Sequence, residues 1–386
     1  MTAASSPTAT DAFRVEPWLH RLGGLVARHP RAWIGLGNLE TRLLRQELDE
    51  VALDAPIYIA GLARSGSTLL LEVLSRHPDV GCHRYRDYPM LFTPYGWRRF
   101  LARVPQQRRA PVERAHADGI AVTPESPEAF EEMLWMAFFP ALHDPHESAV
   151  LDAATRHPQF ESFYRDHLRK LLRIEERSRY LSKENYNFTR LEYLHRLFPD
   201  ARFVVPVRDP VWHIASLMKQ HRLFCAGQRA HPRALTHVQR VGHFEFGLDR
   251  RPINAADREA IERIEALWRD GAEVEGWARY WSHVHHFLAD RLEAEPGLCD
   301  ATCLMRYEAL CAAPEPELRS VFEHCGLSID AEALTREAAA IRFPAYYRPE
   351  FSDAEIATIR RLTDGAAARL GVMPAEGDAI GGRAGH

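Results

Sequence analysis

The residues with the clearest potential for chemistry lie in the loop Gly61-Leu62-Ala63-Arg64-Ser65-Gly66-Ser67-Thr68. Two glycines enclose four residues, and two hydroxyl side chains follow the second glycine. Glycine-rich loops of this spacing present backbone N–H groups that bind phosphate oxygens. The arginine adds a positive charge within the loop. We therefore expect a phosphate site formed by Arg64, Ser65, Gly66, Ser67 and Thr68.

Such a loop is positioned by a strand before it and a helix after it. The apolar run at residues 57–60 is typical of a buried parallel strand. After the loop, apolar residues recur at helical spacing from Leu69 to Leu74. The helix is expected to end at His77-Pro78, because proline disfavours the helical conformation of the preceding residue. Its N-terminus would add to the anion site.

The loop differs from a Walker A motif at one position. A Walker A loop has a lysine directly after its second glycine, and this lysine reaches the β- and γ-phosphates. Ser67 occupies that position here. The sequence therefore argues against transfer of a γ-phosphoryl group.

The segment GLARSGSTLL, followed by HPDV, resembles the 5′-phosphosulfate loop of sulfotransferases that use 3′-phosphoadenosine-5′-phosphosulfate (PAPS). Because the loop contains an arginine, it is most similar to the branch of the family typified by protein-tyrosine sulfotransferases. In that family, an arginine at the end of a later strand and a serine eight residues on bind the 3′-phosphate. Arg208, after the apolar run 203–207, and Ser216 have that spacing. A guanidinium fork and a hydroxyl can share the oxygens of one phosphate.

The resemblance covers about residues 55–330 and implies an α/β fold. It implies a P-loop NTPase-like, three-layer domain with a central parallel sheet and helical insertions, PAPS as sulfuryl donor, and no metal. In protein-tyrosine sulfotransferases a lysine at a place similar to Lys183 stabilises the transferring group. Lys183 follows a predicted short strand at residues 179–182 and is one of only three lysines. We expect Arg64 and Lys183 to be the catalytic cations.

The group that takes the acceptor's proton is less well defined. The protein-tyrosine enzymes use a glutamate shortly after the HPDV-like segment, but His83-Arg84-Tyr85 occupies this place here. Asp87 is the first carboxylate that follows, and partial burial is expected to raise its pKa toward neutrality. His83 is the second choice, because imidazole titrates near neutral pH. A salt bridge from Asp87 to Arg84 or Arg86 is the structural alternative.

The remaining chain is expected to frame this site. Residues 1–54 read as an N-terminal helical lead-in and residues 55–386 as the sulfotransferase-like domain. Within it, 84–150 and 222–255 are expected to be insertions at the acceptor site, with 98–127 an exposed loop and 222–255 irregular. Residues 256–292 read as one long helical stretch. The segment 341–351 resembles the family's C-terminal nucleotide-binding loop, where Arg348 is a further phosphate contact.

Composition limits the partners. The chain of 386 residues has a formal net charge of −4, which does not favour nucleic-acid binding by bulk electrostatics. No apolar run reaches the roughly 18 residues of a membrane span, and the N-terminus lacks the features of a secretory signal. We expect a cytoplasmic protein. Its partner would be a small-molecule, carbohydrate or lipid acceptor, and the N-terminal helices would suit a homo-oligomer.

The predicted function is transfer of a sulfuryl group from PAPS to a hydroxyl or amine. One alternative is a P-loop kinase or NTPase with a degenerate Walker A loop, which magnesium-dependent ATP binding would support. Another is a nucleotide-binding protein without catalysis. Replacing Asp87 or His83 by alanine without effect, while cofactor binding is retained, would favour this second alternative.

Overall fold

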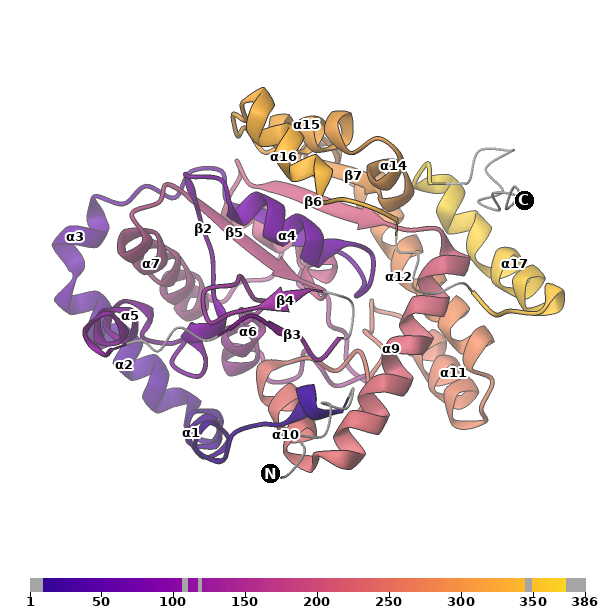
Figure 1. Ribbon diagram of the computed structural model, residues 1–386, viewed down its shortest axis with the longest axis horizontal. Helices are drawn as coiled ribbons and strands as arrows, with labels where there is room; N and C mark the ends of the chain where they lie inside the picture. Colours follow the sequence, from indigo (N-terminus) through magenta and orange to yellow (C-terminus); the bar gives the residue numbers. More distant parts are fainter. Residues whose placement is uncertain (1–9, 106–109, 117–119, 344–348, 373–386) are drawn as a thin grey trace, which may run out of the picture.

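A computed structural model describes residues 10–105, 110–116, 120–343 and 349–372 (Figure 1). A five-stranded, all-parallel sheet lies at its centre, with strand order β2-β5-β1-β6-β7. This confirms the predicted α/β class. The strands are β1 (Ile57–Ala60), β2 (Val80–Gly81), β5 (Arg179–Glu184), β6 (Arg202–Val207) and β7 (Thr302–Arg306).

The register of the central strands brings three of the predicted site segments to one edge. On β1, Ile59 lies opposite Lys183 of β5 and also opposite Val204 of β6. All three strands run in the same direction. The loop after β1, the last residues of β5 and Arg208 after β6 therefore meet at the carboxyl edge of the sheet, where α/β folds bind their ligands.

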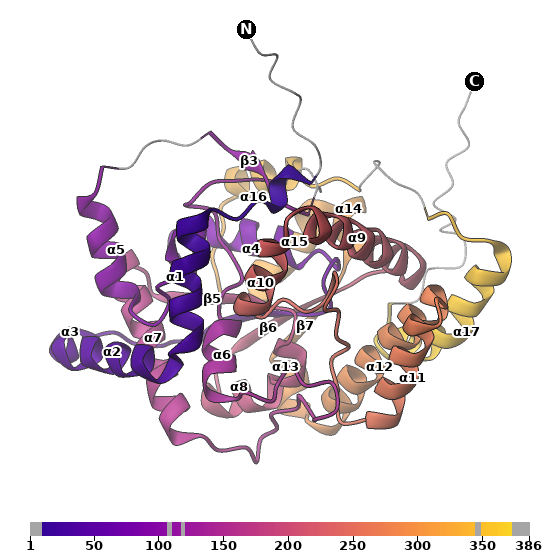
Figure 2. The same cartoon turned by 90° about the horizontal axis from the view of Figure 1, so that it is seen from below.

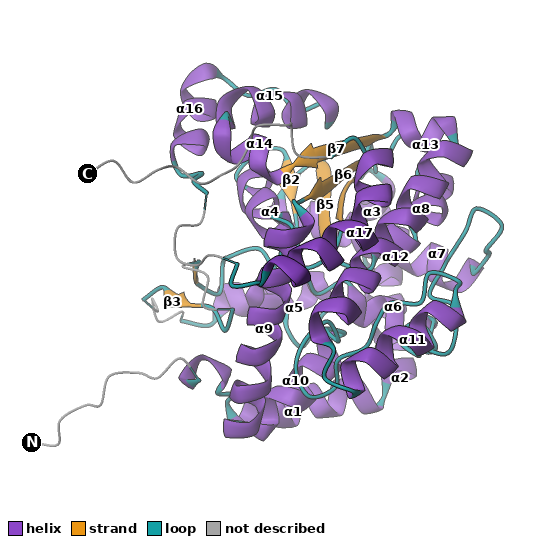
Figure 3. Ribbon diagram, turned by 90° about the vertical axis from the view of Figure 1, so that its right-hand side faces the viewer, coloured by secondary structure: helices purple, strands orange, loops and turns teal. Residues whose placement is uncertain are grey.

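Helices cover both faces of the sheet, so the central strands are apolar on both sides (Figure 3). Ile57 and Ile59 face one core, and Tyr58 faces the other. The first core contains residues of α4 (Ser67–Ser75), α14 (Tyr307–Ala312), α15 (Pro314–His324) and α16 (Ala331–Ala339). The second contains residues of α7 (Pro158–Glu175), α8 (Leu191–Leu197), α9 (Pro210–Ala230), α11 (Arg258–Arg269), α12 (Glu273–Ala294), α13 (Pro296–Asp300) and α17 (Asp353–Arg369).

Of the three N-terminal helices, the second and the third pack beside α7 (Figure 2). The buried Lys170 of α7 donates to the carbonyl of Gly37 at 3.0 Å and pairs with Glu40 at 3.2 Å. These helices are α1 (Pro17–Arg28), α2 (Pro30–Leu43) and α3 (Arg45–Asp49). In the described part of the chain, no helix has the length and apolar character needed to cross a membrane.

Three expectations about the connecting segments are wrong. The segment 98–127 is not simply a loop, because α5 (Pro94–Arg103) extends into it, before the hairpin of β3 (Val112–Glu113) and β4 (Ala121–Val122). The segment 222–255 is largely helical: α9 continues to its residue 230 and α10 (Pro232–Val241) follows, with proline at its start and left-handed Gly242 at its end. A further helix, α6 (Glu132–Phe138), lies between the hairpin and α7.

The third correction concerns residues 256–292. They form two helices, α11 and α12, and not one. Gly271 lies between them with φ of +78°, a left-handed conformation that stops a helix. The apolar spacing continues on both sides of this glycine, which explains why the pattern alone suggested a single helix.

Candidate functional site

The loop after β1 makes a tight turn that requires its glycines. Gly61 has φ of +148° and Gly66 has φ of +105°. A Cβ at Gly66 would lie 2.6 Å from Cδ2 of Tyr307, which leaves no room for a side chain. Arg64 also has a left-handed backbone, with φ of +71°. This geometry turns the chain from β1 directly into α4, as the sequence predicted.

The loop contains polar groups that are suited to an anion. The Oγ of Ser65 is fully buried and has no hydrogen-bond partner among the described residues. No side chain caps the N-terminus of α4, which begins at Ser67. The first N–H groups of a helix have no partner within it, so they are available to a ligand oxygen. A buried hydroxyl without a partner is costly unless a ligand satisfies it.

The structure brings the two predicted phosphate stretches into contact. Arg64 donates from Nε to Oγ of Ser216 on α9 at 3.3 Å. Arg208, directly after β6, donates from Nη1 to the carbonyl of Arg64 at 3.4 Å. Its guanidinium carbon lies 4.8 Å from the centre of the Tyr307 ring. Two cations and the Ser216 hydroxyl therefore converge beside the loop. Arg348 lies outside the described residues.

Lys183 lies half-buried at the end of β5, opposite Ile59 and thus beside the strand that leads into the loop. The next residue, Glu184, was missed by sequence reasoning. Its carboxyl group is buried, and its Oε2 has no hydrogen-bond partner within the described ranges. Burial and the neighbouring Glu132 raise the pKa of Glu184 to about 8. The sequence did contain a signal for Glu184: it is a carboxylate directly after a candidate lysine, at the carboxyl end of a strand.

Charged residues of the segment after α10 lie near Glu184. Asn185 donates to Glu245, and Nδ1 of His243 lies 3.7 Å from Oε1 of Glu245. Burial opposes the charge on His243, but Glu245 and Glu184 raise the pKa of His243 to about 9. The end of β5 therefore lies in a cluster of interacting acids and one histidine.

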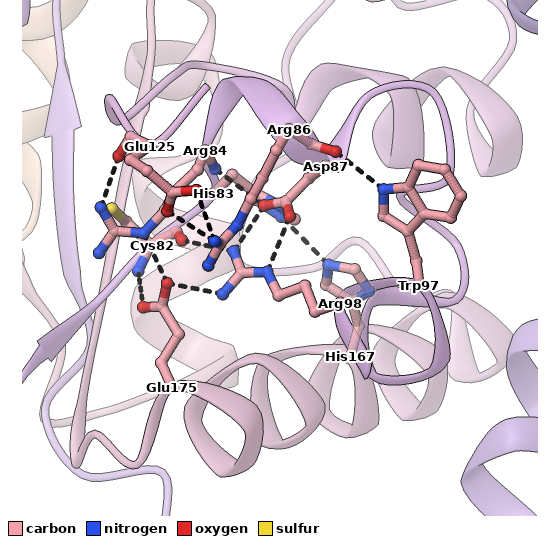
Figure 4. A network of polar contacts seen from close by, with 10 residues as sticks. All are labelled: Cys82, His83, Arg84, Arg86, Asp87, Trp97, Arg98, Glu125, His167 and Glu175. Atoms are coloured by element: carbon pink, nitrogen blue, oxygen red, sulfur yellow. Dashed lines mark hydrogen bonds and ion pairs between the residues drawn. The ribbon is translucent and has the colours of Figure 1, made fainter. Parts of the chain in front are cut away.

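Asp87 does not have the environment expected of it (Figure 4). Arg98 donates to both of its carboxylate oxygens, at 2.7 and 2.5 Å, and the backbone N–H of Arg84 donates to it at 2.8 Å. Burial alone would raise the pKa of Asp87, but Arg98 and His83 outweigh it and hold the pKa well below its usual range. The expected rise is therefore wrong. Asp87 forms an ion pair, but with Arg98 and not with the Arg84 or Arg86 side chain that the structural alternative named.

His83 is buried between an acid and a second histidine. Its Nδ1 lies 3.5 Å from Oδ2 of Asp87, and its Nε2 lies 3.1 Å from Nε2 of His167 on α7. Burial and His83 lower the pKa of His167 well below its usual range. The Asp87 carboxylate can therefore orient the His83 ring, whose other nitrogen faces a neutral imidazole.

Comparison with known proteins agrees with this geometry. Residues 56–251 match the model of the sulfotransferase family. The human protein-tyrosine sulfotransferase 1 is 30% identical over 155 residues, which are 40% of this chain and 31% of the relative. The enzyme of that name from Danio rerio is 29% identical over 155 residues, 40% of this chain and 32% of the relative. The chain thus matches about a third of the length of these relatives.

The similar solved structures are distant in sequence. Sulfotransferase STF9 from Mycobacterium avium is 13% identical, with a TM-score of 0.50 over 95% of this chain and 92% of that chain. Sulfotransferase STF1 from Mycobacterium tuberculosis is 17% identical, with a TM-score of 0.44 over 95% and 90%. The similarity to STF9 shows a shared fold.

Proposed function

Because this chain belongs to the sulfotransferase family, we propose that it transfers a sulfuryl group from PAPS to a hydroxyl or amine of an acceptor. The observation that carries the proposal is the contact of Arg64 with Ser216 and with Arg208 across the loop after β1. These cations lie beside a loop that lacks the lysine of phosphoryl-transfer enzymes. The arrangement suits a nucleotide with charged groups at both its 5′ and its 3′ positions.

In this proposal each end of the donor has its own contacts. The backbone N–H groups and hydroxyls of Ser65, Gly66, Ser67 and Thr68 bind the 5′-phosphosulfate, together with Arg64. Arg208 and Ser216 bind the 3′-phosphate, with Arg348 as a further contact. The uncapped N-terminus of α4 contributes its partial positive charge to the 5′ end.

The transfer itself needs an aligned nucleophile and stabilisation of developing charge. The acceptor oxygen or nitrogen forms a bond to sulfur while the bond from sulfur to the 5′-phosphate oxygen breaks. The electron pair of that bond remains on the phosphate, so 3′,5′-ADP leaves. We propose that Arg64 and the loop N–H groups stabilise the leaving phosphate and that Lys183 stabilises the transferring sulfuryl oxygens.

For the proton of the acceptor we propose Glu184 in place of Asp87. Glu184 follows Lys183 directly, and its buried Oε2 has no hydrogen-bond partner among the described residues. A base is most effective when its pKa lies near the working pH, and burial raises the pKa of Glu184 to about 8. His83, oriented by Asp87, is the alternative proton acceptor.

The acceptor is proposed to be a small molecule, a carbohydrate or a lipid. Both segments that the sequence assigned to the acceptor site contribute to the surroundings of Glu184. The segment 84–150 supplies Glu132, whose N–H donates to Glu184 at 3.4 Å. The segment 222–255 supplies His243, which interacts electrostatically with Glu184, and Glu245, which interacts with Lys183.

Ligand-induced stabilisation tests the donor. Thermal unfolding is measured with 3′,5′-ADP, with ADP and with Mg·ATP, all at the same concentration. A ligand present at about 100 times its dissociation constant stabilises the protein by roughly 2.7 kcal/mol, which corresponds to a few degrees. We expect a shift with 3′,5′-ADP that is unaffected by chelator. A shift with Mg·ATP alone would support the kinase or NTPase alternative.

Transfer is tested with PAPS labelled in its sulfur, incubated with panels of phenols, amines, monosaccharides and lipid alcohols. Appearance of label in an acceptor identifies the substrate class. Retained binding of 3′,5′-ADP, with no label transferred to any panel, would favour the nucleotide-binding protein without catalysis.

A further inference from the structure

The β3–β4 hairpin brings an arginine to the phosphate loop. Nη1 of the half-buried Arg114, directly after β3, lies 3.4 Å from Oγ1 of Thr68 in the first turn of α4. The two residues are 46 positions apart in the sequence. No motif joined them, because the stretch around Arg114 read only as an exposed loop. Figure 1 shows the hairpin below α4 and to the left of α9.

The backbone around Arg114 is held by the hairpin and by α9. Val112 pairs with Val122, and the N–H of Arg114 donates to the carbonyl of Ile120 at 3.1 Å, which extends the ladder. Two residues later, the ring of His116 lies 5.1 Å from the ring of Phe224 on α9. Helix α9 also carries Ser216, so the hairpin bridges the two elements of the donor site.

Two other cations also lie at or beside this loop. Arg64 lies within the loop, and burial together with Arg64 lowers the pKa of Lys219 on α9. Thr68 belongs to the helix end that receives the 5′ end of the nucleotide in the proposed function.

We infer that Arg114 binds the 5′-phosphosulfate of the donor and thereby selects nucleotides with a charged group at this position. The inference rests on the proposed function. A guanidinium can donate two parallel hydrogen bonds to neighbouring oxygens of one anion, which a lysine cannot do. The insertion 84–150, assigned to the acceptor by sequence, thus also contributes to the donor site.

The test compares three ligands in calorimetric titrations of the full chain: 3′,5′-ADP, adenosine 3′-monophosphate and adenosine 5′-monophosphate. Arg114→Ala should weaken 3′,5′-ADP and adenosine 5′-monophosphate by about 10- to 100-fold, the usual range for a hydrogen bond to a charged group. Adenosine 3′-monophosphate should change by less than about twofold. Arg114→Lys should recover part of the loss, because it keeps the charge without the fork.

Arg103→Ala is the matched control, because Arg103 is an exposed arginine at the end of α5 in the same insertion. Equal affinities for Arg114→Ala and Arg103→Ala would overturn the inference and leave the proposed function intact. Equal loss for all three ligands would also overturn it, since this pattern indicates a structural role of the hairpin. Failure of the unmodified protein to bind 3′,5′-ADP would overturn the proposed function itself.

Discussion

Glu132 and Glu184 are buried next to each other, and their pKa values are shifted in opposite directions. Arg190 donates to both carboxylate oxygens of Glu132, at 2.8 and 2.6 Å, and His143 lies 2.7 Å from one of them. Burial opposes ionisation, but Arg190 and His143 lower the pKa of Glu132 to about 2. Glu184 has no such cation pair in the described chain, so the same burial raises its pKa. Two neighbouring acids with separated pKa values are a common arrangement in active sites.

Glu184→Gln is predicted to stabilise the protein at neutral and alkaline pH. The folded-state pKa of about 8 lies above the unfolded value of about 4.3. The unfolded chain therefore releases a proton that the folded chain retains, and stability decreases as pH rises from about 5 to 8. The glutamine removes this cost. Its advantage in melting temperature should grow between pH 5 and 8 and level off above pH 8. A variant that melts lower throughout would show that Glu184 has a structural role.

The same substitution is predicted to impair transfer without impairing donor binding. A general base contributes about 10²- to 10⁴-fold to the rate, so kcat of Glu184→Gln should fall by that factor with the acceptor found by labelled PAPS. The unmodified enzyme should gain activity with pH up to about 8. His83→Asn is the comparison. A larger loss in His83→Asn than in Glu184→Gln would assign the proton to His83.

Sequence reasoning predicted the part of the fold that depends on local pattern. The run at 57–60, the glycine loop and the apolar helix face specify strand, turn and helix within one short segment, and the structure has all three. Sequence reasoning predicted the structure less well where contacts between distant parts of the chain determine which side chains are buried. Arg98 lies on a short helix of mixed composition, and only its buried acid partners explain why this polar residue points inward.

In the candidate site, too, the residues predicted from the sequence are those that a local motif or spacing identifies. Arg64 was predicted from the spacing of its glycine loop, and Arg208 and Ser216 were predicted from the eight-residue spacing that the family resemblance assigns to the 3′-phosphate. Glu184 and Arg114 were missed because their importance comes from neighbours far away in sequence, Glu132 and Thr68. Burial and charge at such positions arise only when the chain is folded.

Arg208→Ala is predicted to distinguish the two ends of the nucleotide. Arg208 is proposed to bind the 3′-phosphate, so its loss should weaken 3′,5′-ADP by about 10- to 100-fold. Adenosine 5′-monophosphate should bind almost unchanged. Ser216→Ala should give a smaller loss with the same preference, because it removes a neutral hydroxyl. Calorimetric titration measures both ligands, and equal losses for both would show that the 3′-phosphate site is placed wrongly.

Arg98→Ala is predicted to destabilise the fold by about 3–5 kcal/mol, because it leaves the Asp87 carboxylate buried without its cation. Arg98 also donates to Glu175 of α7 at 2.6 Å, so a second buried acid loses a partner (Figure 4). Arg99→Ala, an exposed neighbour on the same helix, should be nearly neutral. Urea unfolding measures both.

The ion pair of Asp87 is predicted to make stability depend on pH. Because the folded-state pKa of Asp87 is depressed, its stabilisation is present above about pH 4 and is lost as pH falls further. Asp87→Asn should therefore lose less stability than the unmodified protein when the pH falls below about 4. An equally steep decline in both proteins would mean that other acids control unfolding at low pH.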